Sequence, residues 1–186
     1  NRKNGLIAIN LRDGDELIDI KETSGNDDII IVTKHGKSIR FSEKDVRATG
    51  RAAMGVRALK LGEGDEVISM CLVNEEDKLL VVTQNGFGKR TPVKDYKKQE
   101  RGGKGILTYD KSKFSKTGEL VGAVTVEEDD EVLLINSDGI IIRIEAKDVS
   151  EFGRATQGVK IMKVEEDANI ISMTKVIKED SEKETD

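Results

Sequence analysis

Basic and glycine residues gather in one stretch, Lys89–Gly105, whose charge and open backbone suit a phosphate chain. Between Lys89 and Lys104 the sequence carries seven Lys or Arg and two acids, a local balance of +5. Glycines leave backbone N–H groups unshielded and permit positive φ, so a phosphate can approach the main chain closely. Arginine and lysine add charge and hydrogen-bond donors. The stretch therefore indicates binding of a nucleic-acid backbone, with a solvated turn as the plain alternative.

Cationic residues recur at fixed offsets from glycines in the rest of the chain. An arginine stands four residues after each of three glycines in turn-like contexts, namely Arg40, Arg90 and Arg143. Another stands four residues before three glycines of a recurring box, namely Arg51, Arg101 and Arg154, and Arg57 and Lys160 follow their box glycines by two residues. In a stacked repeat such positions form a stripe along one rim, which neutralises phosphates without reading bases. The alternative is that the arginines pair with the recurrent Asp45, Asp95 and Asp148.

No catalytic or metal site stands out. His35 is the only histidine and precedes a turn glycine, no Cys/His spacing suits zinc, and no phosphate loop of the Walker type is present. The acid clusters Asp27-Asp28 and Glu127–Glu131 are typical of solvated loop ends, with a metal site as the weaker alternative. We expect no enzyme activity, no metal and no cofactor in this chain.

Composition limits the classes of protein that remain. The 186 residues carry a net charge of -5, and the acids concentrate in Glu63–Asp77 and Glu119–Glu131, which leaves room for one positive rim. No apolar run has the length of a membrane span and no secretory signal is evident. The single cysteine, Cys71, lies in an apolar run, so we expect a buried structural thiol in an intracellular protein.

An internal repeat organises the whole chain. The phrase RKNGLIAINL returns as AAMGVRALKL, GGKGILTYD and TQGVKIMKV, and we call these four segments the glycine boxes. Their glycines, Gly5, Gly55, Gly105 and Gly158, are spaced 50, 50 and 53 residues apart. Twelve residues after the first, second and fourth box glycines an apolar strand is predicted to start, at Leu17, Val67 and Ile170, whereas in the third copy the gap to Leu120 is fifteen. The three extra residues of the third copy therefore fall within Ile106–Glu119.

Each repeat also carries a hairpin signal. Nineteen residues beyond Leu17, Val67 and Leu120 stand Gly36, Gly86 and Gly139, each after a turn-forming residue and between β-rich runs. Such pairs predict hairpins, usually with type I′ turns. Units without a helix that cannot cover their apolar face alone form propeller-like or solenoidal arrays. We expect one all-β domain of three to four blades over residues 1–177, with repeats at about 1–48, 49–98 and 99–150 and a half repeat at 151–177.

The two ends of the chain depart from this pattern. Four boxes but only three hairpins are present, so one half-unit is unmatched, most simply the first, whose hairpin would precede Asn1. Residues 178–186 hold five acids, two lysines and no apolar residue, which predicts a disordered acidic tail. The tail is either solubilising or a competitor of DNA for the basic surface.

The boxes GRAAMGVRALKL, QERGGKGI and GRATQGVKIMKV, with the hairpin VVTQNGFGKRTPVKDY, closely resemble the C-terminal domain of DNA gyrase A. The resemblance runs from Asn1 to about Ile177, and Gln99–Gly105 matches the signature box of that family except at Glu100. It implies part of a β-pinwheel with strand exchange between blades, which binds, bends and wraps double-stranded DNA on its outer rim and supports ATP-dependent negative supercoiling. The related C-terminal domain of topoisomerase IV and a propeller-type protein–protein scaffold are the alternatives.

The resemblance also implies partners and sites. The partners would be double-stranded DNA, the rest of the gyrase A polypeptide and the gyrase B polypeptide in a bacterial cytoplasmic holoenzyme, with ATP and magnesium bound outside this chain and no membrane. With the basic pattern, it predicts these nucleic-acid-binding residues: Arg2, Lys3, Arg40, Arg51, Arg57, Lys89, Arg90, Lys97, Lys98, Gln99, Arg101, Gly102, Gly103, Lys104, Gly105, Arg143, Arg154 and Lys160. Tyr96 and Tyr109 match connector and loop positions and receive no catalytic role.

Overall fold

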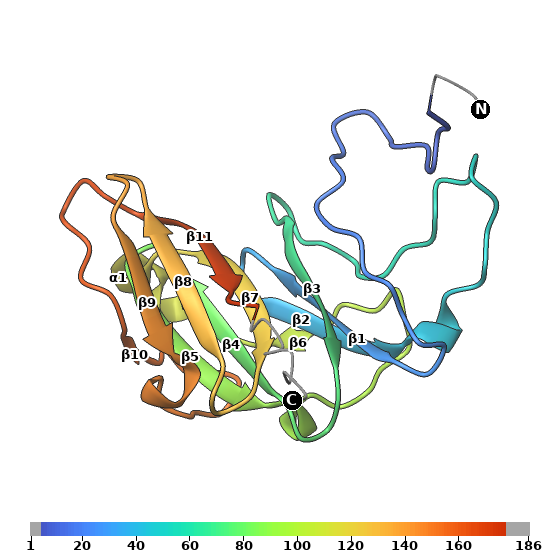
Figure 1. The fold of residues 1–186 in the computed structure, drawn as a ribbon. Helices are drawn as coiled ribbons and strands as arrows, with labels where there is room; N and C mark the ends of the chain where they lie inside the picture. The colour runs from blue at the N-terminus through green and yellow to red at the C-terminus, as the bar shows by residue number, and fades with distance from the viewer. Residues whose placement is uncertain (1–4, 178–186) are drawn as a thin grey trace, which may run out of the picture.

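The computed structural model describes residues 5–177 as three antiparallel sheets (Figure 1). The all-β prediction is confirmed. Helical structure in the described residues is limited to 3-10 turns and one short helix, α1 (Phe114–Thr117). None of the described helices has the length and apolar character that crossing a membrane requires. The predicted tail, and Arg2 and Lys3, fall outside the described residues.

Each sheet is built on one hairpin. The first sheet has the order β3-β1-β2-β6, the second β10-β5-β4-β7 and the third β11-β8-β9. The strand bounds are β1 Asp28–Thr33, β2 Lys37–Ser42, β3 Val67–Val73, β4 Lys78–Thr83, β5 Phe87–Pro92, β6 Ile106–Leu107, β7 Leu120–Val126, β8 Glu131–Asn136, β9 Ile141–Glu145, β10 Val159–Lys160 and β11 Ile170–Lys175. The hairpins β1–β2, β4–β5 and β8–β9 are the three that the sequence predicts.

The turn type within these hairpins differs from the prediction. Gly36, Gly86 and Gly139 have φ of 77°, 80° and 78°. Among the described residues, only glycines have a positive φ. A type I′ turn would need positive φ at the residue before each glycine as well. The N–H of each glycine donates to the carbonyl oxygen three residues back, at 3.1 Å in all three hairpins. These are therefore type I turns followed by a glycine bulge.

Strands are exchanged between repeats, and the exchange follows one rule. The hairpin of the first repeat pairs on one side with β3, from the second repeat, and on the other side with β6, from the third. The hairpin of the second repeat pairs in the same way with β7 and β10. Each of these two sheets thus combines three successive repeats, because the last strand comes from two repeats further along the chain.

The strand predicted from Leu17 is not formed. Residues 15–24 are an extended loop with mostly exposed side chains. The matching strands β3, β7 and β11 each pair with the hairpin of the preceding repeat. Residues 5–16 contain no hairpin that could supply this edge, so Leu17 and its neighbours stay unpaired.

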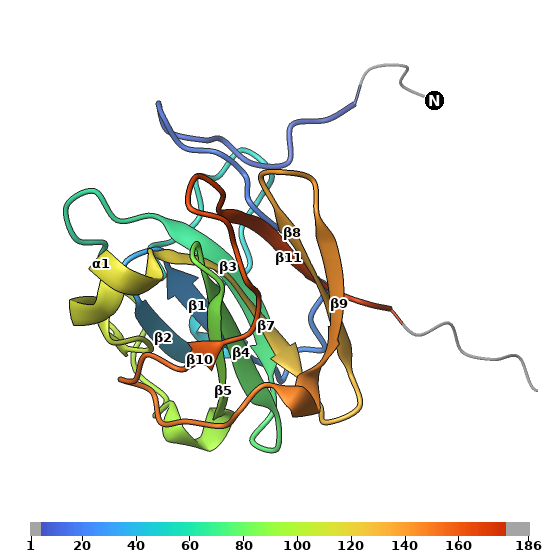
Figure 2. The same cartoon turned by 90° about the vertical axis from the view of Figure 1, so that its left-hand side faces the viewer.

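The inner strands β3, β7 and β11 run side by side through the middle of the molecule (Figure 2). Buried Ile, Val and Leu side chains from the hairpins fill the spaces between the sheets. The extra residues of the third repeat form a 3-10 turn, Lys111–Lys113, and α1, within the predicted interval. They place Phe114 against the buried ring of Tyr109, with 5.8 Å between ring centroids.

Candidate nucleic-acid interface

Successive glycine boxes are joined to one another by a repeated backbone hydrogen bond. In each pair, the N–H five residues after one box glycine donates to the carbonyl oxygen two residues before the next. The three bonds are Asn10 N to Ala53 O at 3.1 Å, Lys60 N to Gly103 O at 2.8 Å and Asp110 N to Thr156 O at 3.3 Å. The four boxes therefore form a continuous row, which we call the box row.

Box glycines let the row lie directly on the sheets. Gly105 and Gly158 have φ of 66° and 75°. A Cβ atom at Gly105 would lie 2.4 Å from Ser38 O, and one at Gly158 would lie 2.4 Å from Gly88 O. A side chain at either position would push β6 or β10 away from its hairpin, so glycine is required at these close approaches.

Box arginines connect neighbouring boxes through their guanidinium groups. Arg101 Nη1 donates to Arg57 O, and Arg154 Nη1 donates to Leu107 O at 2.9 Å. In both cases the acceptor lies two residues after the preceding box glycine. Both side chains are half-buried, and an arginine has five N–H donors, so these bonds leave others for a ligand. Arg101 also reaches back to the first repeat, where its Nε donates at 3.1 Å to the backbone oxygen of Asp45.

Exposed cations line the box row. Among the described residues, none of Arg51, Arg57, Lys104 and Lys160 forms an ion pair, and all four are exposed. Lys60 and Lys163 are also exposed and lie five residues after Gly55 and Gly158. The sequence reasoning missed these two lysines, although their common offset from a box glycine was a usable signal. The longer third repeat also supplies Lys116, whose Nζ lies 5.4 Å from the centroid of the Phe87 ring, and Lys160 Nζ lies 5.7 Å from the same centroid.

The hairpin arginines do not lie on an exposed rim as predicted. Arg40 is 5% exposed. Its guanidinium donates to Asp28 Oδ2 at 2.7 and 3.0 Å, and to the backbone oxygens of Val93 and Tyr96 at 3.3 Å. Burial would raise the pKa of Asp28, but hydrogen bonds from Lys98 and Arg40 outweigh it and hold that pKa below its usual value. Arg40 is therefore a structural connection between the first and second repeats.

Arg90 occupies the same position in the second repeat and is also buried. It donates to Val149 O at 2.7 Å, to Lys147 O at 3.3 Å and to Glu128 Oε2 at 3.0 Å. Arg143, the third member, is exposed and pairs with Glu131. The prediction of a solvent-exposed hairpin series is wrong for Arg40 and Arg90. Their carboxylate partners come from outside the recurrent aspartates, so the alternative of pairing with Asp45, Asp95 and Asp148 is wrong as well.

The remaining predicted residues divide between the surface and the interior. Lys97 is exposed, and Lys98 pairs with Asp28 Oδ1 at 2.8 Å. Gln99 N donates to Arg40 O at 2.7 Å, and Gly102 N donates to Ala58 O at 2.7 Å, so both belong to the connections between repeats. Gly103 is exposed.

Lys89 is completely buried, which corrects its predicted place on the surface. Its ammonium binds backbone oxygens just before the fourth box.

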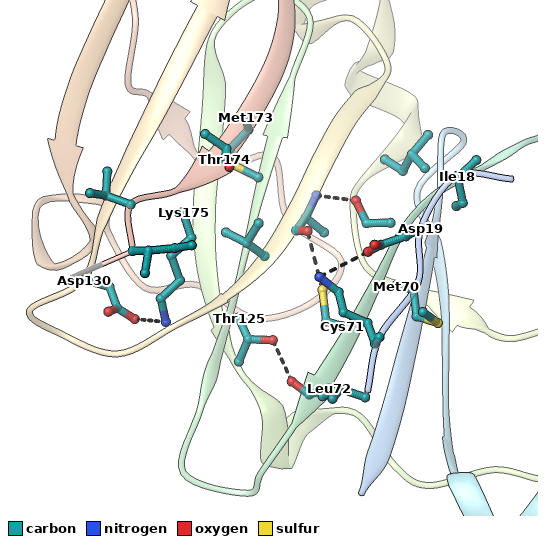
Figure 3. Close-up of a pocket in the computed structure, with 17 residues that line it drawn as sticks. Ile18, Asp19, Met70, Cys71, Leu72, Thr125, Asp130, Met173, Thr174 and Lys175 are labelled. Carbon is teal, nitrogen blue, oxygen red and sulfur yellow. Dashed lines mark hydrogen bonds and ion pairs between the residues drawn. The ribbon is translucent and has the colours of Figure 1, made fainter. Parts of the chain in front are cut away.

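A hollow lies at the centre of the molecule, between the inner strands and residues 18–21 (Figure 3). It has a volume of about 730 Å³. Burial raises the pKa of the Cys71 thiol to about 11, so this thiol stays protonated and unreactive. Two ion pairs lie at the rim of the hollow, Lys175 with Asp130 at 2.5 Å and Lys21 with Asp19 at 3.2 Å. No group of three His, Cys, Asp or Glu residues that could hold a metal occurs within residues 5–177.

Comparisons with known proteins agree with the architecture. The family model described as "DNA gyrase C-terminal domain, beta-propeller" matches residues 1–24, 27–74, 77–127 and 130–177. The DNA gyrase A protein of Clostridium acetobutylicum is 55% identical over 97% of this chain, and that of Streptococcus pyogenes is 58% identical over 97%. In both cases the chain spans 22% of the relative's length.

Solved structures of related C-terminal domains share this fold. A structure of the DNA gyrase A C-terminal domain superimposes with a TM-score of 0.86 and 34% identity, covering 93% of this chain and 58% of that one. The C-terminal domain of DNA topoisomerase IV also gives a TM-score of 0.86, with 28% identity over 91% of this chain and 52% of that one.

Proposed function

Because this chain belongs to the DNA gyrase C-terminal domain family, we propose that it is a non-catalytic module that binds and bends double-stranded DNA. The observation that carries the proposal is the box row, where hydrogen bonds between boxes align cations from separate repeats along one path. Phosphate contacts of this kind provide affinity and position without reading sequence. We assign as phosphate contacts the exposed cations of the boxes and their flanks, Arg51, Arg57, Lys60, Lys104, Lys160 and Lys163, and the exposed Lys97 of the preceding connector. Arg101 and Arg154 add the donors that their contacts between boxes leave over.

The overall acidity does not oppose this function. Acidic loops from two neighbouring repeats, Glu76–Asp77 and Glu127–Asp129, line a common hollow. Lys78 pairs there with Glu128 and with Glu151, the latter at 2.8 Å. Part of the negative charge thus lies in these loops, where Lys78 is paired, whereas Arg51, Arg57, Lys104 and Lys160 form no ion pair among the described residues. Bending a short duplex costs on the order of 1–6 kcal/mol, which several phosphate contacts can offset.

Within a whole enzyme this module would act together with other parts. The chain spans about a fifth of the curated relatives that it matches, so the catalytic centre, ATP and magnesium are assigned to the rest of the gyrase A polypeptide and to the gyrase B polypeptide. The bent DNA would be presented for strand passage that introduces negative supercoils, in the bacterial cytoplasm. The likeness to the topoisomerase IV domain makes that enzyme the second candidate host.

Binding of a short fluorescent duplex at several salt concentrations tests the proposal. We expect log affinity to fall linearly with log salt, with a slope near -0.9 for each phosphate neutralised. The double variant Arg57→Ala, Lys104→Ala removes two exposed cations of the box row, so it should reduce the size of this slope by about 1.8 and weaken binding to all sequences alike.

The matched control is Lys21→Ala with Lys175→Ala, which removes the same charge from the rim of the central hollow. This control should leave most of the affinity and the slope unchanged. Equal losses in both double variants would show a general charge effect and contradict the box row as the site. Absence of duplex binding at moderate salt would instead favour a protein–protein scaffold.

A further inference from the structure

Lys89 is an internal lysine that replaces an apolar residue of the repeat. It lies on β5, three residues after Gly86, and is 0% exposed. The residues at the same offset in the other hairpins are Ile39 and Ile142. A buried ammonium carries a large desolvation penalty, so such a replacement needs compensation by specific partners.

The hydrogen-bond partners of Lys89 all lie in residues 153–156, which lead into the fourth box. Its Nζ donates to Gly153 O at 2.7 Å, to Thr156 Oγ1 at 3.1 Å and to Arg154 O. No carboxylate lies within 4.0 Å of the ammonium among the described residues. Three donors thus meet three uncharged oxygens, which fixes the loop before Gly158 against β5.

The same loop carries the links of the box row. Thr156 O accepts from Asp110 N, and Arg154 Nη1 donates to Leu107 O. Tyr109, whose ring centroid lies 5.6 Å from Lys89 Nζ, donates its hydroxyl to Gln157 O. Lys89 therefore lies beneath the junction between the third and fourth boxes.

Two protonation states of Lys89 are close in energy. Burial, and next the positive charge of Arg154, lower the pKa of Lys89 to about 7, while Asp110 opposes this. The neutral amine has two N–H donors in place of three, so on losing its proton it leaves one loop oxygen without a partner. The charged form alone satisfies the whole loop.

We propose that Lys89 is a proton-linked positioning residue: its ammonium holds the loop that presents Arg154, and a phosphate bound at Arg154 stabilises this ammonium, so that binding of DNA takes up a proton. The proposal rests on the proposed function. The linkage has a definite sign. A phosphate at Arg154 offsets the like charge that disfavours protonation of Lys89, so the pKa of Lys89 rises in the complex. Affinity for DNA consequently increases as the pH falls through the neutral range.

Calorimetry in buffers of different ionisation enthalpy measures the proton directly. At pH 8 we expect the observed binding enthalpy of a short duplex to rise with buffer ionisation enthalpy, with a slope between zero and one proton. If the pKa of Lys89 rises by about 0.5 to 1 on binding, affinity should be about 3- to 7-fold higher at pH 6.5 than at pH 9. Lys89→Met keeps the length of the side chain and should remove both effects.

Two variants serve as controls. Lys97→Met removes an exposed lysine and should keep the proton uptake while lowering affinity. His35→Gln removes the only histidine, which pairs with Glu119 at 3.1 Å, and should also keep the uptake. Equal proton uptake in the wild-type protein and in Lys89→Met, or no uptake in either, would overturn the proposal.

A second measurement uses the wild-type protein without DNA, so that it separates failure of this inference from failure of the proposed function. The side-chain NMR signal of Lys89 should titrate near neutral pH, and amide exchange at residues 155–158 should quicken more between pH 6.5 and 9 than base catalysis alone explains. A Lys89 signal that stays unchanged from pH 6 to 9 would refute the linkage even if DNA binds. Absence of DNA binding would refute the proposed function and the DNA part of this proposal, whatever the NMR shows.

Discussion

The arginines that follow the turn glycines by four residues meet two different environments. Arg40 and Arg90 are buried and bind backbone oxygens of the following repeat, whereas Arg143 is exposed with a single carboxylate partner. A buried arginine that loses its place leaves partners unsatisfied in a region of low dielectric constant. The same residue type at the same repeat position is therefore structural in two copies and a surface residue in the third.

Replacement of Arg40 by Met should lower the free energy of unfolding by roughly 2–4 kcal/mol, because Asp28 and two backbone oxygens lose donors inside the protein. Urea unfolding measures this change. Arg143→Met is the matched control and should leave the midpoint almost unchanged, since its ion pair lies in water. Equal stability losses in the two variants would contradict the assignment of Arg40 as a structural connection.

Sequence reasoning located these arginines but not their role. The offset from the turn glycine is visible in the sequence, because the repeat is strict. The partners are not, since Asp28 faces Arg40 only through the register of its own hairpin, and Glu75 and Glu128 come from the repeat that follows Arg40 and Arg90 respectively. The burial of Lys89 was missed for the same reason, because it depends on the fourth box lying on β5.

At the level of elements, the short box strands complete the sheets from two repeats away. β6 and β10 contain two residues each, so few ladder hydrogen bonds hold them. Their attachment depends on the glycine that precedes each strand, where the backbones are closest. The box glycines thus control whether the box row remains on the sheets.

Gly105→Ala and Gly55→Ala form a matched pair for this idea. Both glycines have positive φ, 66° and 76°, but a Cβ at Gly55 would meet only Ile9 Cδ1 at 3.9 Å, whereas one at Gly105 would overlap Ser38 O. We expect Gly55→Ala to cost about 1 kcal/mol from backbone conformation alone. Gly105→Ala should cost roughly 2–5 kcal/mol, because overpacking adds to this strain.

Amide hydrogen exchange shows which strand loses its hydrogen bonds in each variant. Thr108 N, which donates to Gly36 O at 2.9 Å, should lose protection in Gly105→Ala and keep it in Gly55→Ala. Similar protection of Thr108 in both variants would show that the close approach does not hold β6.

The hairpins were predictable because their signal is local, a turn glycine between two apolar runs. The turn type was not, since the same dipeptides also suit a type I turn with a glycine bulge. Leu17 shows the limit of periodicity. It matches Val67 in the repeat, yet a strand needs an edge to pair with, and no hairpin precedes it in the described residues.

For the molecule as a whole, the third sheet differs from the other two at one edge. β2 and β5 are covered by β6 and β10, but no strand pairs with the outer edge of β9 among the described residues. Ile140 and Ile141 there are 50% and 59% exposed. Exposed apolar edge strands promote pairing between molecules.

We therefore expect the chain to self-associate as its concentration rises, which sedimentation velocity measures. Ile141→Lys should shift the equilibrium towards the monomer, because a charge on an edge strand opposes pairing. Ile20→Lys is the control, since Ile20 is more exposed, at 76%, but lies in a loop. A larger effect from Ile20 than from Ile141 would identify the N-terminal loop as the contact.

Exchange of strands across two repeats also sets the order in which the nascent chain can be completed on the ribosome. β2 ends at Ser42 and its neighbour β6 ends at Leu107, so about 65 more residues must be made before the first sheet closes. At the usual pace of synthesis this delay is roughly 3–13 s, during which the first hairpin waits with an open side. A premature stop in the third repeat would therefore remove a strand from the sheet that began two repeats earlier.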